Sequence, residues 1–288
     1  MKALVTGGGG QLAKALVDTA RPGWTVTAPT RADMDIDDGE AVTAALDFVR
    51  PDVIVNAAAF TAVDRAESEA EAAWRTNRDG AGRLADGAAR IGARIVHLST
   101  DFVFDGCSTS PYRPGDATGP LGVYGASKLA GEAAVLASGA QALIVRTAWV
   151  YAGSGRNFLT TMLRLMGEGA AIRVVADQVG TPTSAASLAR ALWALVDLRA
   201  SGVMHFTDSG VASWYDFALA IAQEGYASGL LTARQVVTPI ASADFPTPAR
   251  RPAFSVLDCR ATWTVLGGAP PHWRAGLRRT LNGMRAGR

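Results

Sequence analysis

Residues 2–13 read Lys2-Ala3-Leu4-Val5-Thr6-Gly7-Gly8-Gly9-Gly10-Gln11-Leu12-Ala13, an apolar run that passes through glycines into a helical pattern. Glycines let the backbone turn tightly and approach a pyrophosphate closely. The helix that follows offers free N–H groups and the positive end of its dipole. Two registers fit a phosphate-binding fingerprint, one starting at Gly8 and one at Gly7, and both end at Ala13. The stretch therefore predicts a dinucleotide-binding turn.

Short apolar runs alternate with helical patterns through residues 1–150. Strands are predicted at 2–6, 25–28, 52–56, 94–98 and 142–146, and helices at 11–20, 41–49, 67–92 and 124–138. The strands are continuously apolar, which is typical of a parallel sheet buried on both faces. The predicted fold class is α/β, a Rossmann-type doubly wound parallel sheet with a smaller mixed C-terminal substrate domain.

The rhythm changes after Val150. Residues 1–150 are predicted to form an NAD(P)-binding Rossmann domain, and residues 151–288 mainly a substrate-binding domain. Helices are predicted at 157–166, 184–198, 213–224 and 274–284 in this second part. Strands near 172–175 and 203–206 are predicted to return to the main sheet, and residues 238–252 to form a loop.

Composition excludes several classes of function. The chain has 288 residues, 49% of them hydrophobic, and a formal net charge of +2, which gives no basic field for nucleic acid. No stretch approaches the ~20 apolar residues of a membrane span, and no secretory signal is visible. Cys107 and Cys259 lack partners at zinc spacing, and His97, His205 and His272 lie scattered in apolar surroundings. A cytoplasmic protein without a nucleic-acid or membrane partner is expected.

Tyr124 and Lys128 are four residues apart and share one face of a predicted helix. A free phenol has a pKa of ~10 and is a poor acid–base catalyst at neutral pH, but a nearby ammonium is expected to lower that pKa. The phenol could then exchange a proton with a carbonyl or alcohol oxygen. Ser99, Thr100 and Asp101 end a predicted strand, and ligands bind beyond the carboxyl ends of such strands.

The second predicted strand ends in Ala28-Pro29-Thr30-Arg31, with no carboxylate for an adenosine ribose. Asp33 and Asp35 come slightly later in the chain. Arg31 could meet a 2′-phosphate instead, which favours NADP over NAD. The third strand ends in Asn56-Ala57-Ala58-Ala59, where small residues leave room for a cofactor.

The glycine turn, the NAAA and STD segments and the Tyr–Lys pair, in this order, resemble the extended short-chain dehydrogenase/reductase family. Longer segments at 56–67, 99–106, 124–132, 146–153 and 177–183 are similar to the dTDP-4-dehydrorhamnose reductases within that family. The resemblance runs nearly end to end. It implies reduction of the C4 ketone of dTDP-4-dehydro-6-deoxy-L-mannose to dTDP-L-rhamnose. NADPH is the expected cofactor with NADH as the alternative, and a homodimer stays open.

The resemblance also implies residue roles. Tyr124 donates the proton, Lys128 tunes Tyr124 and holds the nicotinamide ribose, and Thr100 orients the carbonyl. The residues expected to touch the sugar nucleotide are Asp101, Trp149, Val63 and Gln178. The residues expected to bind the cofactor are Gly7, Gly10, Gln11, Leu12, Arg31, Asp35, Ile36, Ala57, Ala58, Ala59, Ser99, Tyr124 and Lys128.

The chain departs from the family pattern at a few positions. Phe60 stands where His or Tyr is frequent, and Phe102 stands where Tyr is common. Because of these two residues, a reductase of another dTDP-4-keto-deoxysugar, as in antibiotic glycosylation, remains an alternative function. A non-catalytic nucleotide-binding regulatory subunit is the other alternative, and the intact Tyr–Lys pair argues against it. Lys14 and Ala15 occupy the stretch where some relatives carry a magnesium-binding glutamate, so no metal is predicted.

Overall fold

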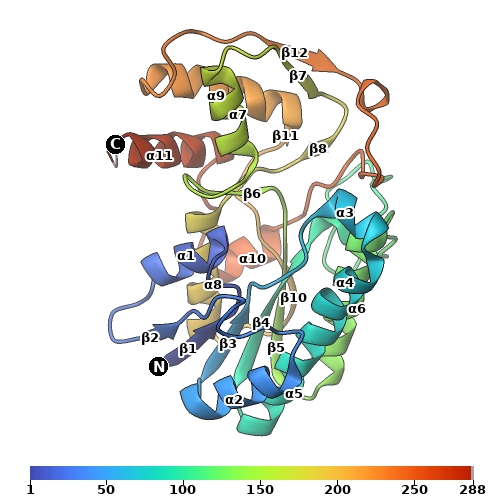
Figure 1. The fold of residues 1–288 in the computed structure, drawn as a ribbon, viewed down its shortest axis with the longest axis vertical. Helices are drawn as coiled ribbons and strands as arrows, with labels where there is room; N and C mark the ends of the chain where they lie inside the picture. The colour runs from blue at the N-terminus through green and yellow to red at the C-terminus, as the bar shows by residue number, and fades with distance from the viewer. Residues whose placement is uncertain (287–288) are drawn as a thin grey trace.

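The computed structural model describes residues 1–286, and a six-stranded parallel sheet forms the centre of the fold in the order β10-β5-β4-β3-β1-β2 (Figure 1). The strands are β1 (Lys2–Val5), β2 (Thr25–Thr27), β3 (Val53–Asn56), β4 (Arg94–Thr100), β5 (Gln141–Thr147) and β10 (Gly202–His205). The strand order reverses between β1 and β3, and this switch point opens a crevice at the carboxyl ends of the strands. The predicted Rossmann-type sheet is confirmed.

Helices cover both faces of the sheet because its strands are apolar on both sides. One face carries α1 (Gln11–Asp18) and α8 (Ala185–Asp197), which contribute Leu16 and Leu192 to its core. The other face carries α2 (Gly39–Val49), α5 (Ala81–Ile91) and α6 (Val123–Ala137), with Leu46 and Leu84 in a second core. The chain thus builds one layered α/β unit that includes α8 and β10 from its second half.

The helical stretch predicted at 67–92 is broken into pieces. It takes in the last two residues of α3 (Val63–Ser68), then α4 (Ala70–Trp74), a π-helical turn η1 (Arg75–Gly80) and α5. The side chain of Asn77 in η1 bonds the backbone of Phe60 in both directions, at 2.8 and 3.1 Å. A π-helical turn displaces the helix by one residue, and such turns often lie at functional sites.

A second packed unit lies above the sheet in Figure 1 and is built on α7 (Phe158–Gly167), α9 (Trp214–Ala227) and α11 (Trp273–Ala286). β7 (Ile172–Val175) pairs here with β12 (Val237–Ile240), so the prediction that 172–175 returns to the main sheet is wrong. The alternating burial of β7 fits an edge outside the large sheet. The same pairing converts part of the predicted loop at 238–252 into a strand. The prediction for 203–206 agrees with β10, which pairs with β5.

Short strand pairs join the two units. β6 (Val150–Tyr151) pairs with β9 (Thr183–Ser184), and β8 (Val179–Gly180) pairs with β11 (Ala212–Ser213). The remaining short elements are η2 (Asp101–Val103), η3 (Ser242–Asp244) and α10 (Arg260–Val265). Through residues 1–286, every helix is too short or too polar to span a bilayer.

Candidate active site

The glycine turn lies at the switch point, between β1 and α1. Gly7 has φ 71°, a left-handed conformation that favours glycine, and an added Cβ there would lie 3.0 Å from the backbone of Ala58. A Cβ on Gly8 would lie 2.1 Å from the carbonyl oxygen of Ala28, so only glycine allows this approach. Gly10 is the N-cap of α1 and makes no side-chain cap, which leaves the first-turn N–H groups free for an anion.

Neighbouring strand ends border the turn. Ala58 donates its N–H to Thr6 Oγ1 at 3.0 Å, which holds the Ala57–Ala59 segment beside the glycines. Gln11 donates from Nε2 to the carbonyl oxygen of Val150 at 2.9 Å, and its buried Oε1 has no partner among residues 1–286. Leu12 packs against the core of the α1 face. The turn and the alanines therefore form one cradle with a polar atom free to bind.

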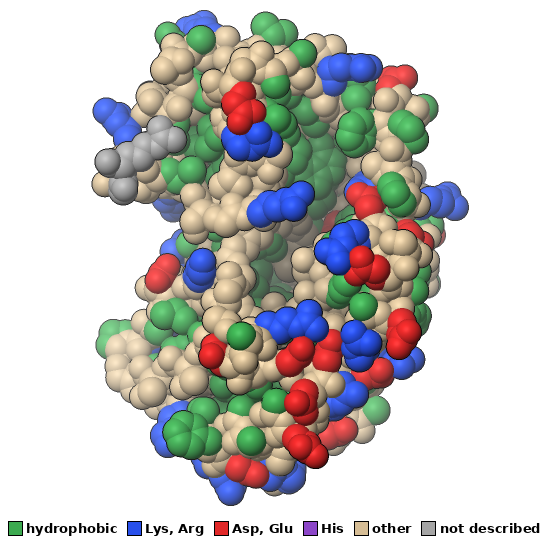
Figure 2. Space-filling model, viewed as in Figure 1, with side chains coloured by type: hydrophobic (Ala, Val, Ile, Leu, Met, Phe, Trp, Pro, Cys, Tyr) green, Lys and Arg blue, Asp and Glu red, His purple; other side chains and the backbone are tan. Residues whose placement is uncertain are grey.

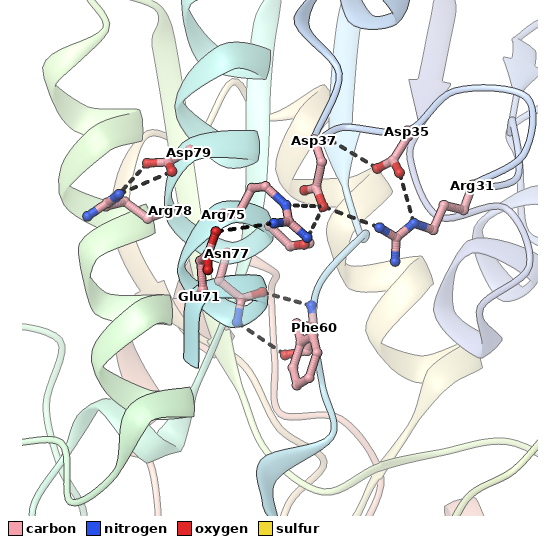
Figure 3. A network of polar contacts seen from close by, with 10 residues as sticks. Arg31, Asp35, Asp37, Phe60, Glu71, Arg75, Asn77, Arg78 and Asp79 are labelled. Carbon is pink, nitrogen blue, oxygen red and sulfur yellow. Dashed lines mark hydrogen bonds and ion pairs between the residues drawn. The ribbon is translucent and has the colours of Figure 1, made fainter. Parts of the chain in front are cut away.

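A charged network lies beyond the end of β2 (Figure 3). The Arg31 guanidinium bonds Asp35 at 3.0 Å and Asp37 at 3.2 Å, and Arg75 bonds the same Asp37 oxygen at 3.3 Å. Arg31 is therefore present where a 2′-phosphate is predicted, but carboxylates already neutralise part of its charge. Ile36 is only 3% exposed and packs under Gly80 in the core, so its predicted cofactor contact stays a prediction.

The end of β4 places two side chains on opposite faces. Ser99 donates to Glu132 of α6, which forms a buried two-pronged pair with Arg146 of β5 at 2.7 and 2.8 Å. Thr100 donates to Asp101 Oδ1 at 3.0 Å and caps η2 by accepting the N–H of Phe102. The Ser99 hydroxyl is thus engaged by α6, and its predicted cofactor contact stays a prediction.

Asp101 is a buried carboxyl with spare capacity. Burial raises its pKa to about 6, while the nearby hydroxyl groups of Ser255 and Thr100 lower it. Its Oδ2 has no hydrogen-bond partner among the described residues. The carboxyl is therefore able to accept a hydrogen bond from a bound hydroxyl.

Tyr124 and Lys128 lie one turn apart on α6, close to the end of β4. Gly125 lets α6 approach η2, because a Cβ there would lie 2.2 Å from the carbonyl oxygen of Phe102. Lys128 Nζ donates to the carbonyl oxygen of Leu98 at 2.6 Å. Burial lowers the pKa of Lys128 to about 8, against the Glu132 carboxylate, which raises it.

The expected direction of the Tyr124 pKa is wrong. Burial raises the pKa of Tyr124 to about 12. The nearby Thr100 hydroxyl lowers it, and the charge of Asp101 raises it further. Lys128 is directed to the Leu98 carbonyl, so its charge does not offset the burial of the phenol. The phenol consequently keeps its proton at neutral pH, which suits a proton donor.

Trp149 follows β5 with φ 50°, a strained backbone conformation for a large side chain. Its ring stacks on Trp214 of α9, with centroids 3.6 Å apart and an angle of 7° between the planes. A Cβ on Gly180 would lie 2.7 Å from the ring, so the glycine leaves room for it. The packing of two elements thus fixes the Trp149 indole.

The other predicted sugar contacts lie on both sides of the crevice. Val63 begins α3, which packs on α6, and Gln178 donates to Ser242 Oγ at 2.9 Å. Ser255, whose hydroxyl lowers the pKa of Asp101, donates its backbone N–H to the carbonyl oxygen of Val179, next to Gln178. The molecule is hollowed between its two units, and hydrophobic side chains line the recess (Figure 2).

Sequence reasoning missed some of these contributors. Trp214 and Ser255 lie more than 60 residues from Trp149 and Asp101, the residues they touch, and no spacing rule connects them. His97, placed among scattered histidines, lies 3.4 Å from Lys128 Nζ. The alternation of side chains along β4, from Ser99 back to His97, could have placed it on the α6 face.

Together, the parallel sheet, the glycine turn at its switch point and the Tyr–Lys pair define a short-chain dehydrogenase/reductase. A family model described as RmlD substrate binding domain matches residues 1–286. A dTDP-4-dehydrorhamnose reductase from Sinorhizobium fredii is 42% identical, over 98% of this chain and 97% of its own. Another from Mycobacterium tuberculosis (strain H37Rv) is 43% identical, over 96% and 91%. The chain belongs to the RmlD family.

Solved structures agree with the family assignment. A dTDP-4-dehydrorhamnose reductase from Clostridium acetobutylicum superposes with a TM-score of 0.93 at 37% identity, covering 99% of this chain and 100% of that one. The Bacillus anthracis enzyme, solved in complex with NADP, gives a TM-score of 0.91 at 34% identity, covering 97% and 98%.

Proposed function

We propose that the chain reduces the C4 ketone of dTDP-4-dehydro-6-deoxy-L-mannose to dTDP-L-rhamnose with NADPH, NADH being the alternative hydride donor. The observation that carries this proposal is the cluster of Thr100, Tyr124 and Lys128 beside the glycine turn, in a chain of the RmlD family. Relatives of nearly equal length carry the name dTDP-4-dehydrorhamnose reductase.

The raised pKa of Tyr124 fits the direction of the reaction. Reduction of a ketone needs an acid that gives a proton to the forming alkoxide, and a phenol with a pKa of about 12 is protonated at neutral pH. The Thr100 hydroxyl lowers the pKa of Tyr124, and it can stabilise the phenolate that remains by turning its one proton from Asp101 Oδ1 to the phenolate oxygen. The positive charge of Lys128, one helical turn away, also favours the phenolate, but burial outweighs this effect in the pKa of Tyr124.

The cradle fits a dinucleotide. Gly7 and Gly8 let the turn pack against the backbone of Ala58 and Ala28, the N-cap Gly10 leaves the start of α1 uncapped for a phosphate, and the buried Oε1 of Gln11 is free to accept a hydrogen bond. The nicotinamide ring supplies the hydride when the cofactor is bound. Leu12, Ala57–Ala59, Ser99, Arg31, Asp35 and Ile36 complete the proposed cofactor site. Arg31 favours the 2′-phosphate of NADPH, and its pairing with Asp35 and Asp37 leaves NADH acceptable.

The proposed sugar site faces this cradle. The unpaired Oδ2 of Asp101 accepts a hydrogen bond from a sugar hydroxyl, and Trp149 offers a fixed apolar face. Val63 and Gln178 line the site from α3 and from the segment before β8. Within this proposal the chain acts in the cytoplasm, and a homodimer is its assembly.

The test is to mix the purified chain with NADPH or NADH and the 4-keto sugar nucleotide, to follow the reduced-nicotinamide absorbance and to identify the product. We expect oxidation of the cofactor and formation of dTDP-L-rhamnose. Tyr124→Phe should lose at least ~10²-fold in rate while it still binds cofactor, since it lacks the acid. A fully active Tyr124→Phe protein, or a wild type that oxidises neither cofactor with any dTDP-4-keto sugar, contradicts the proposal.

A reductase of another dTDP-4-keto-deoxysugar is the second candidate. The ring of Phe102 lies edge-on to Tyr124, with centroids 5.7 Å apart, so this departure from the family pattern borders the reacting centre. The same assay with a panel of dTDP-4-keto sugars distinguishes the two candidates. A regulatory subunit without catalysis is disfavoured, because the acid and its partners are intact.

A further inference from the structure

A buried chain of hydrogen bonds runs from the glycine turn to Lys128. Thr6 Oγ1 accepts the N–H of Ala58 at 3.0 Å and donates to Asn56 Oδ1 at 2.7 Å. Asn56 Nδ2 lies 3.0 Å from His97 Nδ1, and His97 Nε2 lies 3.4 Å from Lys128 Nζ. Thr6, Asn56, His97 and Lys128 are all at most 3% exposed, so water does not compete for these bonds.

These hydrogen bonds run in one direction, and that direction fixes the tautomer of the His97 imidazole. Thr6 Oγ1 accepts the Ala58 N–H and gives its one proton to Asn56 Oδ1. The Asn56 amide therefore turns its NH₂ group toward His97 Nδ1. An NH₂ group only donates, so Nδ1 must be an unprotonated acceptor. Burial and the nearby Lys128 charge hold the pKa of His97 well below its usual range, so the ring is neutral and its proton is on Nε2.

We propose, resting on the function above, that His97 is a positioning residue that presents its Nε2–H to Lys128 Nζ and so favours the neutral amine over the ammonium. An ammonium carries only donors, so it would place one N–H against another. A neutral amine has a lone pair that accepts the His97 proton. Its remaining N–H groups can still donate to the Leu98 carbonyl, at 2.6 Å.

Other charges around Lys128 are balanced. Glu132 on the same helix favours the ammonium, but Arg146 of β5 pairs with that carboxylate at 2.7 Å. Asp101, at the end of β4, acts on Tyr124 instead. Burial brings the pKa of Lys128 to about 8, so small contributions decide its form near neutral pH. Because only the ammonium stabilises the phenolate, His97 sets the upper pH limit of the reaction.

The tautomer can be measured without turnover. The chain has 3 histidines, so ¹⁵N-histidine labelling gives few signals, and His97→Gln identifies the His97 pair. We expect a protonated Nε2 and a bare Nδ1 from pH 6 to pH 9. A proton on Nδ1, or an imidazolium, overturns the proposal. Loss of reductase activity alone would leave this result untouched, so the proposed function and this inference fail separately.

The second measurement reverses the direction of these hydrogen bonds by a substitution at Asn56. Asn56→Asp places an acceptor against His97 Nδ1, which moves the proton to Nδ1 and makes Nε2 an acceptor for the ammonium. The lysines of the chain are Lys2, Lys14 and Lys128, so ¹³Cε-lysine labelling follows the Lys128 titration directly. We expect its midpoint, and the alkaline limb of the activity profile, to rise by about one pH unit or more.

The new carboxylate also acts on Lys128 through its charge, and a double variant separates the two effects. In a His97→Leu background, Asn56→Asp should raise the Lys128 midpoint much less, because the imidazole no longer relays the change. An equal rise in both backgrounds contradicts the role of His97. If Asn56→Asp does not fold, the wild-type tautomer still decides the proposal.

Discussion

Asp101 shows how a single residue can trade stability for binding. Its folded pKa of about 6 exceeds the ~3.9 of an unfolded carboxyl, so the folded state binds more protons between about pH 4 and pH 6. Stability from this group therefore falls as pH rises through that window. Asp101→Asn removes the buried charge, and we expect the variant to be more stable than wild type at pH 7, by on the order of 2 kcal/mol.

Urea unfolding at pH 7 and at pH 4 checks this prediction. The stability difference should be large at pH 7 and shrink toward pH 4, where the wild-type carboxyl is protonated. Asp105→Asn is the matched control, since the Tyr112 hydroxyl lowers the pKa of that exposed carboxyl. Its removal should leave stability unchanged or reduce it. If the stability gain of Asp101→Asn over wild type is smaller at pH 7 than at pH 4, the assignment is contradicted.

At the scale of elements, the position of α6 depends on its glycines. A Cβ on Gly131 would lie 2.1 Å from the carbonyl oxygen of Asn77 in η1, a backbone atom that cannot move aside alone. Gly131→Ala should push α6 away from η1 and displace Tyr124 and Lys128 with it. We expect a loss of stability of ~1–3 kcal/mol and a lower kcat, measured by urea unfolding and by the reductase assay.

Gly283→Ala in α11 is the control for that substitution. A Cβ there meets nothing within 4 Å, so the exchange should be neutral or stabilising, by at most ~1 kcal/mol. Activity of Gly131→Ala equal to that of Gly283→Ala would show that α6 does not need this close contact.

Elements whose neighbours are local in sequence were predictable, and the others were not. The continuous apolar runs identified β1, β3, β4 and β5, because a strand that is buried on both faces needs apolar residues at successive positions. β7 is also mostly apolar, but Arg173 interrupts it and its burial alternates. Its partner β12 lies more than 60 residues later, and nothing local indicates that pairing. The Tyr124–Lys128 spacing predicted their shared face, whereas the depth of burial that raises the phenol pKa depends on η2 and β4 together.

At the scale of the whole molecule, an ion pair ties the two units across the recess. Arg251 bonds Asp64 of α3 at 2.7 Å and also bonds Thr247 and the carbonyl oxygen of Ala249. The segment that carries Arg251 descends from β12 toward α3 in Figure 1. Asp64 follows Val63, a predicted sugar contact, so the pair holds that side of the site against the second unit.

Arg251→Gln should therefore raise the KM for the sugar nucleotide while it changes the free energy of unfolding only slightly. The pair is partly exposed, with 23% and 40% of its side chains accessible, and such pairs add only ~0–1 kcal/mol to stability. We expect KM for the sugar nucleotide to rise severalfold with kcat little changed, and proteolysis within 241–252 to quicken. Arg260→Gln breaks an outer-surface pair with Asp258 and should change neither. Because added salt screens exposed charges, it should raise the wild-type KM toward that of Arg251→Gln. Equal KM values for Arg251→Gln and Arg260→Gln would show that the Arg251–Asp64 pair does not affect substrate binding.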